Sequence, residues 1–196
     1  MNLPNKLTIF RIILVPIMVI IPFLKIPGDI LNIPIPNLVI IAIFAIASYT
    51  DHLDGKIARK NNLVTTFGKF ADPLADKILV LSAMLMLVEM DYLPALIPII
   101  VLTREFVVSG YRLIAVENGG KVIAASIWGK IKTATQMIAI ILALLDSNFF
   151  GAFIYEGLTG YNLVINVLST SLILISTIAT VFSGIDYLRG SKELFK

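Results

Sequence analysis

Cysteine is absent from the sequence, and histidine occurs only once, at His52. The absence of cysteine excludes a disulfide framework and thiolate metal sites, so a bound metal would need oxygen ligands or His52. Charged residues are also scarce, at 15% of the chain against 58% hydrophobic residues, and the mean hydropathy is +0.92. This balance excludes an ordinary soluble domain and indicates a chain that resides in a lipid bilayer.

Long apolar stretches account for most of the chain. A bilayer core of about 30 Å needs roughly 20 apolar residues per helix, and a window of that length predicts spans at residues 7–24, 37–59, 72–90, 93–115, 124–146 and 161–187. Turn-forming residues separate these segments, and no repeat or low-complexity tract is visible. We therefore expect an all-α integral membrane bundle of six transmembrane helices, which forms a single domain over residues 1–196.

The positions of Lys and Arg predict the orientation, because these residues resist translocation across the membrane. An even number of spans puts both termini on one side. If that side is the cytoplasm, Lys25 is the only basic residue on the opposite face, where Asp29, Glu89 and Asp91 gather. We expect a multi-pass protein of the cell membrane with both termini and the active site at the cytoplasmic face. The net charge of +3 then reflects loops that face anionic lipid, so we expect no nucleic acid partner.

Four aspartates lie at the ends of two neighbouring predicted helices. Asp51 and Asp54 are about 60° apart around one helix, and Asp72 and Asp76 are about 40° apart around the next, so each pair shares a helical face. Carboxylates crowded beside hydrocarbon repel one another and lose hydration, which requires a compensating cation. Oxygen ligands favour Mg²⁺ or Mn²⁺, and we expect a cluster of two ions that shares its coordination with substrate phosphates.

Small residues and one arginine accompany the acids in the pattern Asp51-x-x-Asp54-Gly55-x-x-Ala58-Arg59, followed by Gly68-x-x-x-Asp72-x-x-x-Asp76. Gly55, Ala58 and Gly68 leave room for a ligand against the backbone, and Arg59 can fork onto a diphosphate. Two simpler explanations stay open. The small residues can serve close helix packing, and Arg59 can be a basic anchor at the cytoplasmic face.

This pattern resembles the signature of the CDP-alcohol phosphotransferase family, with all eight positions and both spacings present. The resemblance covers essentially the whole chain, because the family also has six helices. It implies that Asp51, Asp54 and Asp72 coordinate the metals and that Asp76 is both a ligand and the general base. It further implies that Gly55, Ala58, Arg59 and Gly68 line the CDP site, that CDP-diacylglycerol is the donor lipid, and that the protein is a homodimer. In such a reaction the acceptor oxygen attacks the β-phosphorus and CMP departs.

The N-terminal pattern Asn2-x-Pro4-Asn5-x-x-Thr8-x-x-Arg11 fits the same picture. Asn5 and Thr8 are three residues apart, so both can face the cytoplasmic cavity and bind the nucleotide or its phosphates. Helix capping beside Pro4 is the alternative explanation.

A second polar cluster is basic and includes Arg104, Arg112, Lys130 and Lys132. Arg104 and Arg112 are about 80° apart around a helix, so both can face one pocket. An acceptor that carries its own phosphate would need such a cluster, whereas a neutral amino alcohol would not. The alternative is that cytoplasmic helix ends are commonly basic.

The segment around these cations resembles the branch of the family whose acceptor is sn-glycerol 3-phosphate. An Arg104-Glu105-Phe106 stretch, the later Arg112 and a Gly-Lys-x-Lys-Thr run from Gly129 carry this resemblance. Ser109 departs from it, because threonine is expected there, although both residues carry a hydroxyl group.

Two other functions stay open at this point. The first is a family member with a different acceptor, such as serine, inositol phosphate or a second phospholipid. The second is a cation channel or transporter, since acids within a membrane often mark ion paths. Against a channel, the predicted spans carry no second acidic ring deeper in the membrane.

Overall fold

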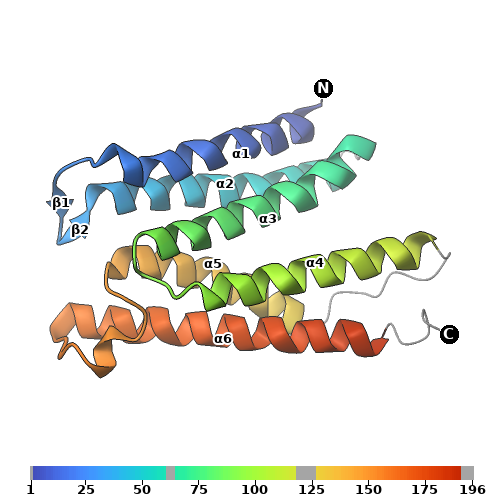
Figure 1. Ribbon diagram of the computed structural model, residues 1–196. Coiled ribbons are helices and arrows are strands. Elements are labelled where there is room, and N and C mark those ends of the chain that lie inside the picture. Colours follow the sequence, from blue (N-terminus) through green and yellow to red (C-terminus); the bar gives the residue numbers. More distant parts are fainter. Residues whose placement is uncertain (1, 61–64, 118–126, 191–196) are drawn as a thin grey trace. The chain divides into compact units, whose positions relative to one another are not determined.

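The computed structural model describes residues 2–60, 65–117 and 127–190 and divides into two compact units, Met1–Tyr92 and Leu93–Lys196. Almost all described residues are helical (Figure 1). The predicted all-α class is therefore confirmed.

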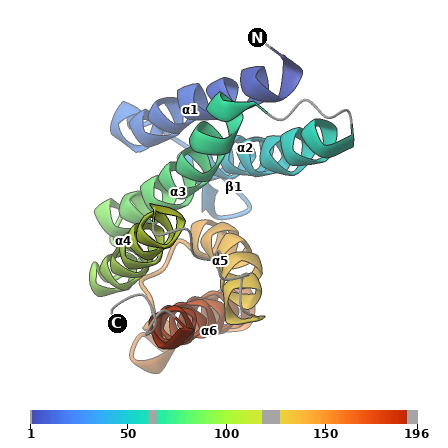
Figure 2. The same ribbon diagram turned by 90° about the vertical axis from the view of Figure 1, so that its right-hand side faces the viewer.

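The first unit is built from three long helices, which are α1 (Leu3–Ile20), α2 (Ile35–Lys60) and α3 (Thr66–Glu89). Helix α1 packs against both α2 and α3, as Figures 1 and 2 show. A 3-10 turn, η1 (Ile21–Leu24), and a hairpin of β1 (Asp29–Ile30) and β2 (Ile33–Pro34) connect α1 to α2. The hairpin turn is formed by Leu31 and Asn32, both of which have positive φ, as a tight two-residue turn requires.

Polar side chains cap the starts of α1 and α3. Asn2 is the N-cap of α1 and accepts a hydrogen bond from the Asn5 backbone N–H at 3.2 Å. Thr65 is the N-cap of α3 and accepts one from the Gly68 N–H at 3.0 Å. Each cap satisfies a backbone donor that a helix N-terminus leaves unpaired, which fixes where α1 and α3 begin.

The second unit contains α4 (Leu96–Glu117), α5 (Ile127–Asp146), a short 3-10 helix η2 (Ala152–Ile154) and α6 (Gly160–Gly190). Helix α6 packs against both α4 and α5. The buried Asp146 ends α5 and accepts hydrogen bonds from Asn166 at 2.7 Å and Ser169 at 2.8 Å, both on α6. These bonds fasten the loop between α5 and α6 at one end of the unit.

Helix α6 has a polar inner face and an apolar outer face. Ser176, Thr180 and Ser183 are buried, whereas Leu174, Ile178 and Phe182 are exposed. In water this arrangement would be unfavourable, but lipid surrounds apolar side chains at no cost, and small polar residues allow close helix packing. The pattern is that of a membrane helix.

Within the described residues, four helical segments are long and apolar enough to cross a membrane: Leu3–Leu24, Ile35–Gly55, Ile127–Asp146 and Gly160–Arg189. Each of the six predicted spans overlaps a long helix, although residues 124–126 of the fifth span lie outside the described residues, and α3 and α4 are not among the four segments. Helix α3 carries Asp72, Asp76 and Lys77, and α4 carries Arg104, Glu105 and Arg112, so charge rather than length separates them from the other helices. The count of six crossings stays a prediction.

Candidate active site

Asp51 and Asp54 of α2 and Asp72 of α3 all contact α1, which packs against both of these helices (Figure 1). Asn5, Thr8 and Arg11 follow one another at three-residue intervals along α1, so they occupy one face of the helix. All three are buried. They are the residues through which α1 contacts the acidic segments of α2 and α3.

Arg11 is the central cation of this cluster, and its side chain is fully buried. Its Nη2 donates to Asp54 Oδ2 at 2.6 Å, its Nε donates to the Ala47 carbonyl at 3.2 Å, and its Nη1 lies 2.8 Å from Asp51 Oδ1 as an ion pair. One guanidinium group therefore holds both carboxylates of α2. Asp54 is buried as well, at 2% exposure, so this ion pair is shielded from solvent.

Thr8 and Asn5 make the corresponding contacts to α3 and the residue before it. The Thr8 hydroxyl donates to Asp72 Oδ1 at 2.5 Å, and Asn5 Oδ1 accepts a hydrogen bond from the Thr65 hydroxyl at 2.9 Å. The predicted polar face of Asn5 and Thr8 is therefore present in the structure. The N-cap of α1 is Asn2, so capping at this terminus does not account for either side chain.

Gly68 allows α3 to approach these groups closely. A Cβ atom at this position would lie 3.3 Å from Asn5 Oδ1, 3.3 Å from Thr65 Oγ1 and 3.5 Å from Asp72 Oδ2. A side chain here would crowd three polar groups of the cluster at once, so glycine serves close approach at this point. Gly55 is half-buried on α2, whereas the side chains of Ala58 and Arg59 lie outside the described residues.

The four predicted metal ligands belong to two helices of the same unit. Asp51 and Asp72 both lie close enough to interact electrostatically with Asp54, and Asp76 follows Asp72 by one turn of α3. Among the described side chains, however, no group of three acids or histidines is arranged to hold an ion, and Arg11 and Thr8 bind oxygens of three of these acids. The metal quartet therefore stays a prediction.

The donor chemistry of the cluster does fit a divalent cation. Arg11 pairs with Asp51 and Asp54, and Asp72 lies near Asp54, so three carboxylates face the single positive charge of one guanidinium group and an excess of negative charge remains beside the buried Asp54. Such an excess is costly unless a cation joins it. Carboxylate oxygens are the ligands that Mg²⁺ and Mn²⁺ prefer.

Three of the four predicted cations of the second unit come together in the structure. Arg104 Nη1 lies 2.8 Å from Glu105 Oε1, and Lys132 Nζ contacts the same oxygen. Arg112 Nη2 lies 2.6 Å from the Tyr187 hydroxyl, and Tyr187 also contacts Arg104. Lys130 is exposed and lies about 200° around α5 from Lys132, so it faces away from this group.

The residues that contact predicted site residues without being predicted for the site include Arg11, Ser183 and Tyr187. A lone arginine in an apolar span signals a buried partner, which is the sequence feature that identifies Arg11. Ser183 and Tyr187 are four residues apart on α6, and this spacing puts two polar groups on one helical face.

A family model described as CDP-alcohol phosphatidyltransferase matches residues 1–182. The chain belongs to this family. Members of the family generally use divalent metal ions, and the resemblance drawn from the aspartate pattern is confirmed.

Curated relatives of the chain carry names that agree with this assignment. A CDP-diacylglycerol--glycerol-3-phosphate 3-phosphatidyltransferase of Bacillus subtilis is 48% identical over 153 residues, which cover 74% of this chain and 78% of the relative. A protein of the same name from Haemophilus influenzae is 36% identical over 97% of this chain and 94% of its own length. A probable phosphatidylglycerophosphate synthase of Mycobacterium tuberculosis is 36% identical over 95% of this chain and 79% of its own length.

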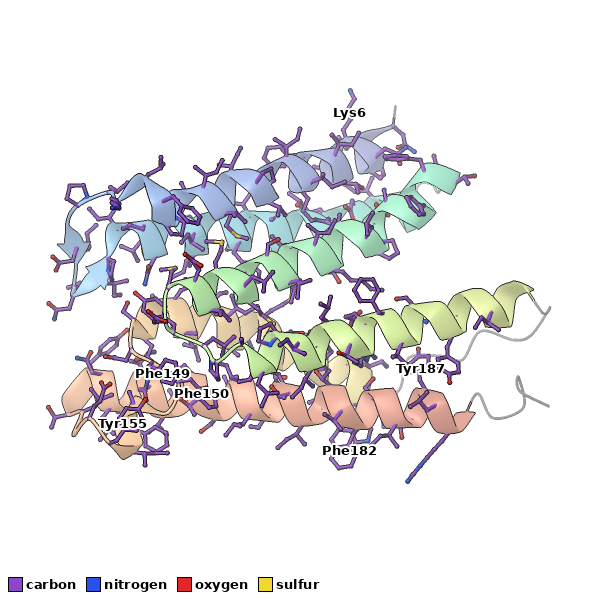
Figure 3. The ribbon with its side chains drawn as sticks, viewed as in Figure 1. Lys6, Phe149, Phe150, Tyr155, Phe182 and Tyr187 are labelled. Carbon is purple, nitrogen blue, oxygen red and sulfur yellow. The ribbon has the colours of Figure 1, made fainter. Side chains whose placement is uncertain are left out.

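Replacement of Arg11 tests whether it holds the acids together. Arg11→Gln leaves Asp54 buried without its cation, so we expect the free energy of unfolding to fall by about 3 kcal/mol. Thermal unfolding of the purified protein in detergent measures the loss as a lower Tm. Lys6→Gln is the matched control, because Lys6 is an exposed basic residue of the same helix (Figure 3).

The double variant Arg11→Gln/Asp54→Asn removes both charges, and we expect it to recover part of the lost stability. If Arg11→Gln unfolds at the wild-type temperature, the buried ion pair does not stabilise the first unit.

Proposed function

We propose that the chain transfers the phosphatidyl group of CDP-diacylglycerol to sn-glycerol 3-phosphate, which gives phosphatidylglycerophosphate and CMP. Membership of the family and the names of the relatives support the donor and the acceptor. The observation that carries the choice of acceptor is the cluster of Arg104, Arg112 and Lys132 in the second unit. A phosphate on the acceptor provides the negative charge that such a cluster binds.

In this proposal Asp76 is the general base. It takes the proton of a free hydroxyl of glycerol 3-phosphate, and the resulting oxygen forms a bond to the β-phosphorus of CDP-diacylglycerol. The bond from the β-phosphorus to the bridging oxygen breaks, and CMP leaves with that oxygen. Asp76 is half-buried one turn after Asp72, so it belongs to the acidic end of α3.

Asp51, Asp54, Asp72 and Asp76 would hold Mg²⁺ or Mn²⁺, with two ions in the cluster. When bound, the metal offsets the negative charge of the diphosphate and of the transition state. Arg11 and Thr8 fix the orientation of the ligands, because Arg11 holds Asp54 through Oδ2 and Thr8 holds Asp72 through Oδ1. Partners of this kind orient ligand carboxylates in metal sites generally.

The proposed CDP site is formed by residues of the first unit. Asn5 and Thr8 present polar groups beside Gly68, whose missing side chain lets the backbone come close to a ligand. The members of the proposed site are Asn5, Thr8, Gly55, Ala58, Arg59 and Gly68. The proposed acceptor site consists of Arg104, Arg112, Lys130 and Lys132.

We further propose six membrane crossings, with both termini and the active site at the cytoplasmic face of the cell membrane. Charges on α3 and α4 do not prevent a crossing, because charged residues within a membrane are tolerated where they pair with one another inside the protein, as Arg104 and Glu105 do. The diacylglycerol chains stay in the bilayer beside these helices. A homodimer is expected from the family resemblance, and the molar mass of the detergent-solubilised protein measures it.

An acceptor panel tests the proposed reaction. With CDP-diacylglycerol, we expect the purified protein to release CMP with glycerol 3-phosphate, but not with serine, inositol phosphate or a second phospholipid. Asp76→Ala should abolish release, because no base remains to take the proton, while the CDP-lipid still binds. The measurements are CMP formation and binding of the donor lipid. CMP release with inositol phosphate but not with glycerol 3-phosphate would exclude the proposed acceptor, and turnover by Asp76→Ala would remove Asp76 from the mechanism.

Removal and return of the metal test the acidic cluster. A chelator should abolish CMP release, and Mg²⁺ or Mn²⁺ should restore it. Mn²⁺ binding, followed by electron paramagnetic resonance, should weaken by at least tenfold in Asp72→Asn, because a ligand oxygen loses its charge. Asp91→Asn is the control, since Asp91 is exposed just beyond α3. Unchanged Mn²⁺ affinity in Asp72→Asn would contradict the proposed ligands.

Labelling of single cysteines tests the orientation, because the natural chain has none. We expect Asp29→Cys and Glu156→Cys to react with an impermeant maleimide in intact cells. Lys196→Cys should react only after permeabilisation, since positive-inside bias places the C-terminus in the cytoplasm. The reverse pattern would invert the proposed topology.

A further inference from the structure

Two residues of α6, Ser183 and Tyr187, face the arginines of α4. They lie one helical turn apart and are almost fully buried, at 0% and 3% exposure. Figure 3 shows Tyr187 on the side of α6 towards α4, whereas Phe182 leaves α6 on the other side. Neither residue belongs to the proposed acceptor site, yet each binds one of its arginines.

Tyr187 contacts both arginines through different parts of its side chain. Its hydroxyl accepts a hydrogen bond from Arg112 Nη2 at 2.6 Å, and its ring centroid lies 5.4 Å from Arg112 Cζ and 5.8 Å from Arg104 Cζ. Cations at this distance are attracted by the electron-rich face of an aromatic ring. One tyrosine thus steadies two like charges that would otherwise repel each other.

Ser183 and two glycines set the position of Arg104. The Ser183 hydroxyl accepts a hydrogen bond from Arg104 Nη2 at 2.5 Å. A Cβ atom at Gly184 would lie 3.4 Å from Arg104 Cγ, and one at Gly129 would lie 3.8 Å from Arg104 Nη2. The backbones of α5 and α6 therefore come close around this side chain.

Arg104 keeps a donor for a further partner. Within the described residues, its Nε is buried and has no hydrogen-bond partner, although Nη1 contacts Glu105 and Nη2 contacts Ser183. A guanidinium group carries five N–H donors in a fixed fork. A phosphate oxygen matches such a fork in charge and geometry.

We propose that Ser183 and Tyr187 are positioning residues that hold Arg104 and Arg112 in the arrangement that selects an acceptor with a phosphate group. This inference rests on the proposed function. Tyr187 and Ser183 act through the arginines and do not touch the reacting atoms. Their loss should therefore weaken recognition of the acceptor phosphate and leave the donor lipid and the chemical step unaffected.

Kinetics of three variants test this inference. Tyr187→Phe keeps the ring and removes only the hydroxyl, Tyr187→Leu removes both, and Ser183→Ala removes the bond to Arg104. We expect Tyr187→Phe and Ser183→Ala to raise the KM for glycerol 3-phosphate about tenfold, as loss of one hydrogen bond to a charged group implies. Tyr187→Leu should raise it further. The kcat and the KM for CDP-diacylglycerol should stay within twofold of wild type.

The matched control is Tyr161→Phe, because Tyr161 is an exposed tyrosine at the start of the same helix. A second readout is the preference for glycerol 3-phosphate over glycerol, which lacks the phosphate. This preference should shrink in the Tyr187 and Ser183 variants by the same factor as the KM rises, and it should not change in Tyr161→Phe.

The outcomes separate this inference from the proposed function. If wild-type protein makes no product from glycerol 3-phosphate, the proposed function fails. If wild type is active but the KM for glycerol 3-phosphate is unchanged in Tyr187→Phe and Tyr187→Leu, the positioning role is wrong. A purely structural role would lower Tm and change both KM values together, which also overturns the inference.

Discussion

A guanidinium group buried between two carboxylates is the interaction on which the first unit depends. Arg11 joins α1 to α2 through Asp51 and Asp54, at a depth where an unpaired charge would be very costly. Water cannot solvate the buried carboxylate of Asp54, so its neighbours must supply the compensating charge and hydrogen-bond donors. Arg11 and Thr8 do so from one face of α1, so the first helix contributes to the candidate site.

The second unit also holds like charges close together, but different groups stabilise them. Its excess charge is positive, and it is balanced by one carboxylate, Glu105, and by the hydroxyl groups and aromatic face of α6. These hydroxyl groups and the aromatic ring are neutral, so they leave most of the positive charge of the basic cluster uncompensated. In the proposed function, a basic cluster of this kind would bind the phosphate group of the acceptor alcohol.

Helical periodicity and hydropathy predict most of this architecture. Six apolar windows correspond to six long helices, and the spacing of Asp51, Asp54, Asp72 and Asp76 predicts which acids share a face. The periodicity of a sequence predicts which residues share one face of a helix, but it does not predict which other helix packs against that face. The partners of Arg11 and Tyr187 therefore escape prediction, because they lie 36 to 43 and 75 residues away along the chain. Lys130 shows a second limit, since residues close together in a basic run can lie on different faces of a helix.

The spacing of the two arginines on α4 explains why a residue of another helix is needed to hold both side chains. Arg104 and Arg112 are eight residues apart, or about 12 Å along the axis of α4. Residues at this distance do not contact each other directly, and α4 alone would let their long side chains move independently. Tyr187 on α6 reaches both groups with one ring. Packing between helices thus restrains both cations, because Tyr187 contacts both of them while Ser183 and Glu105 also hold Arg104.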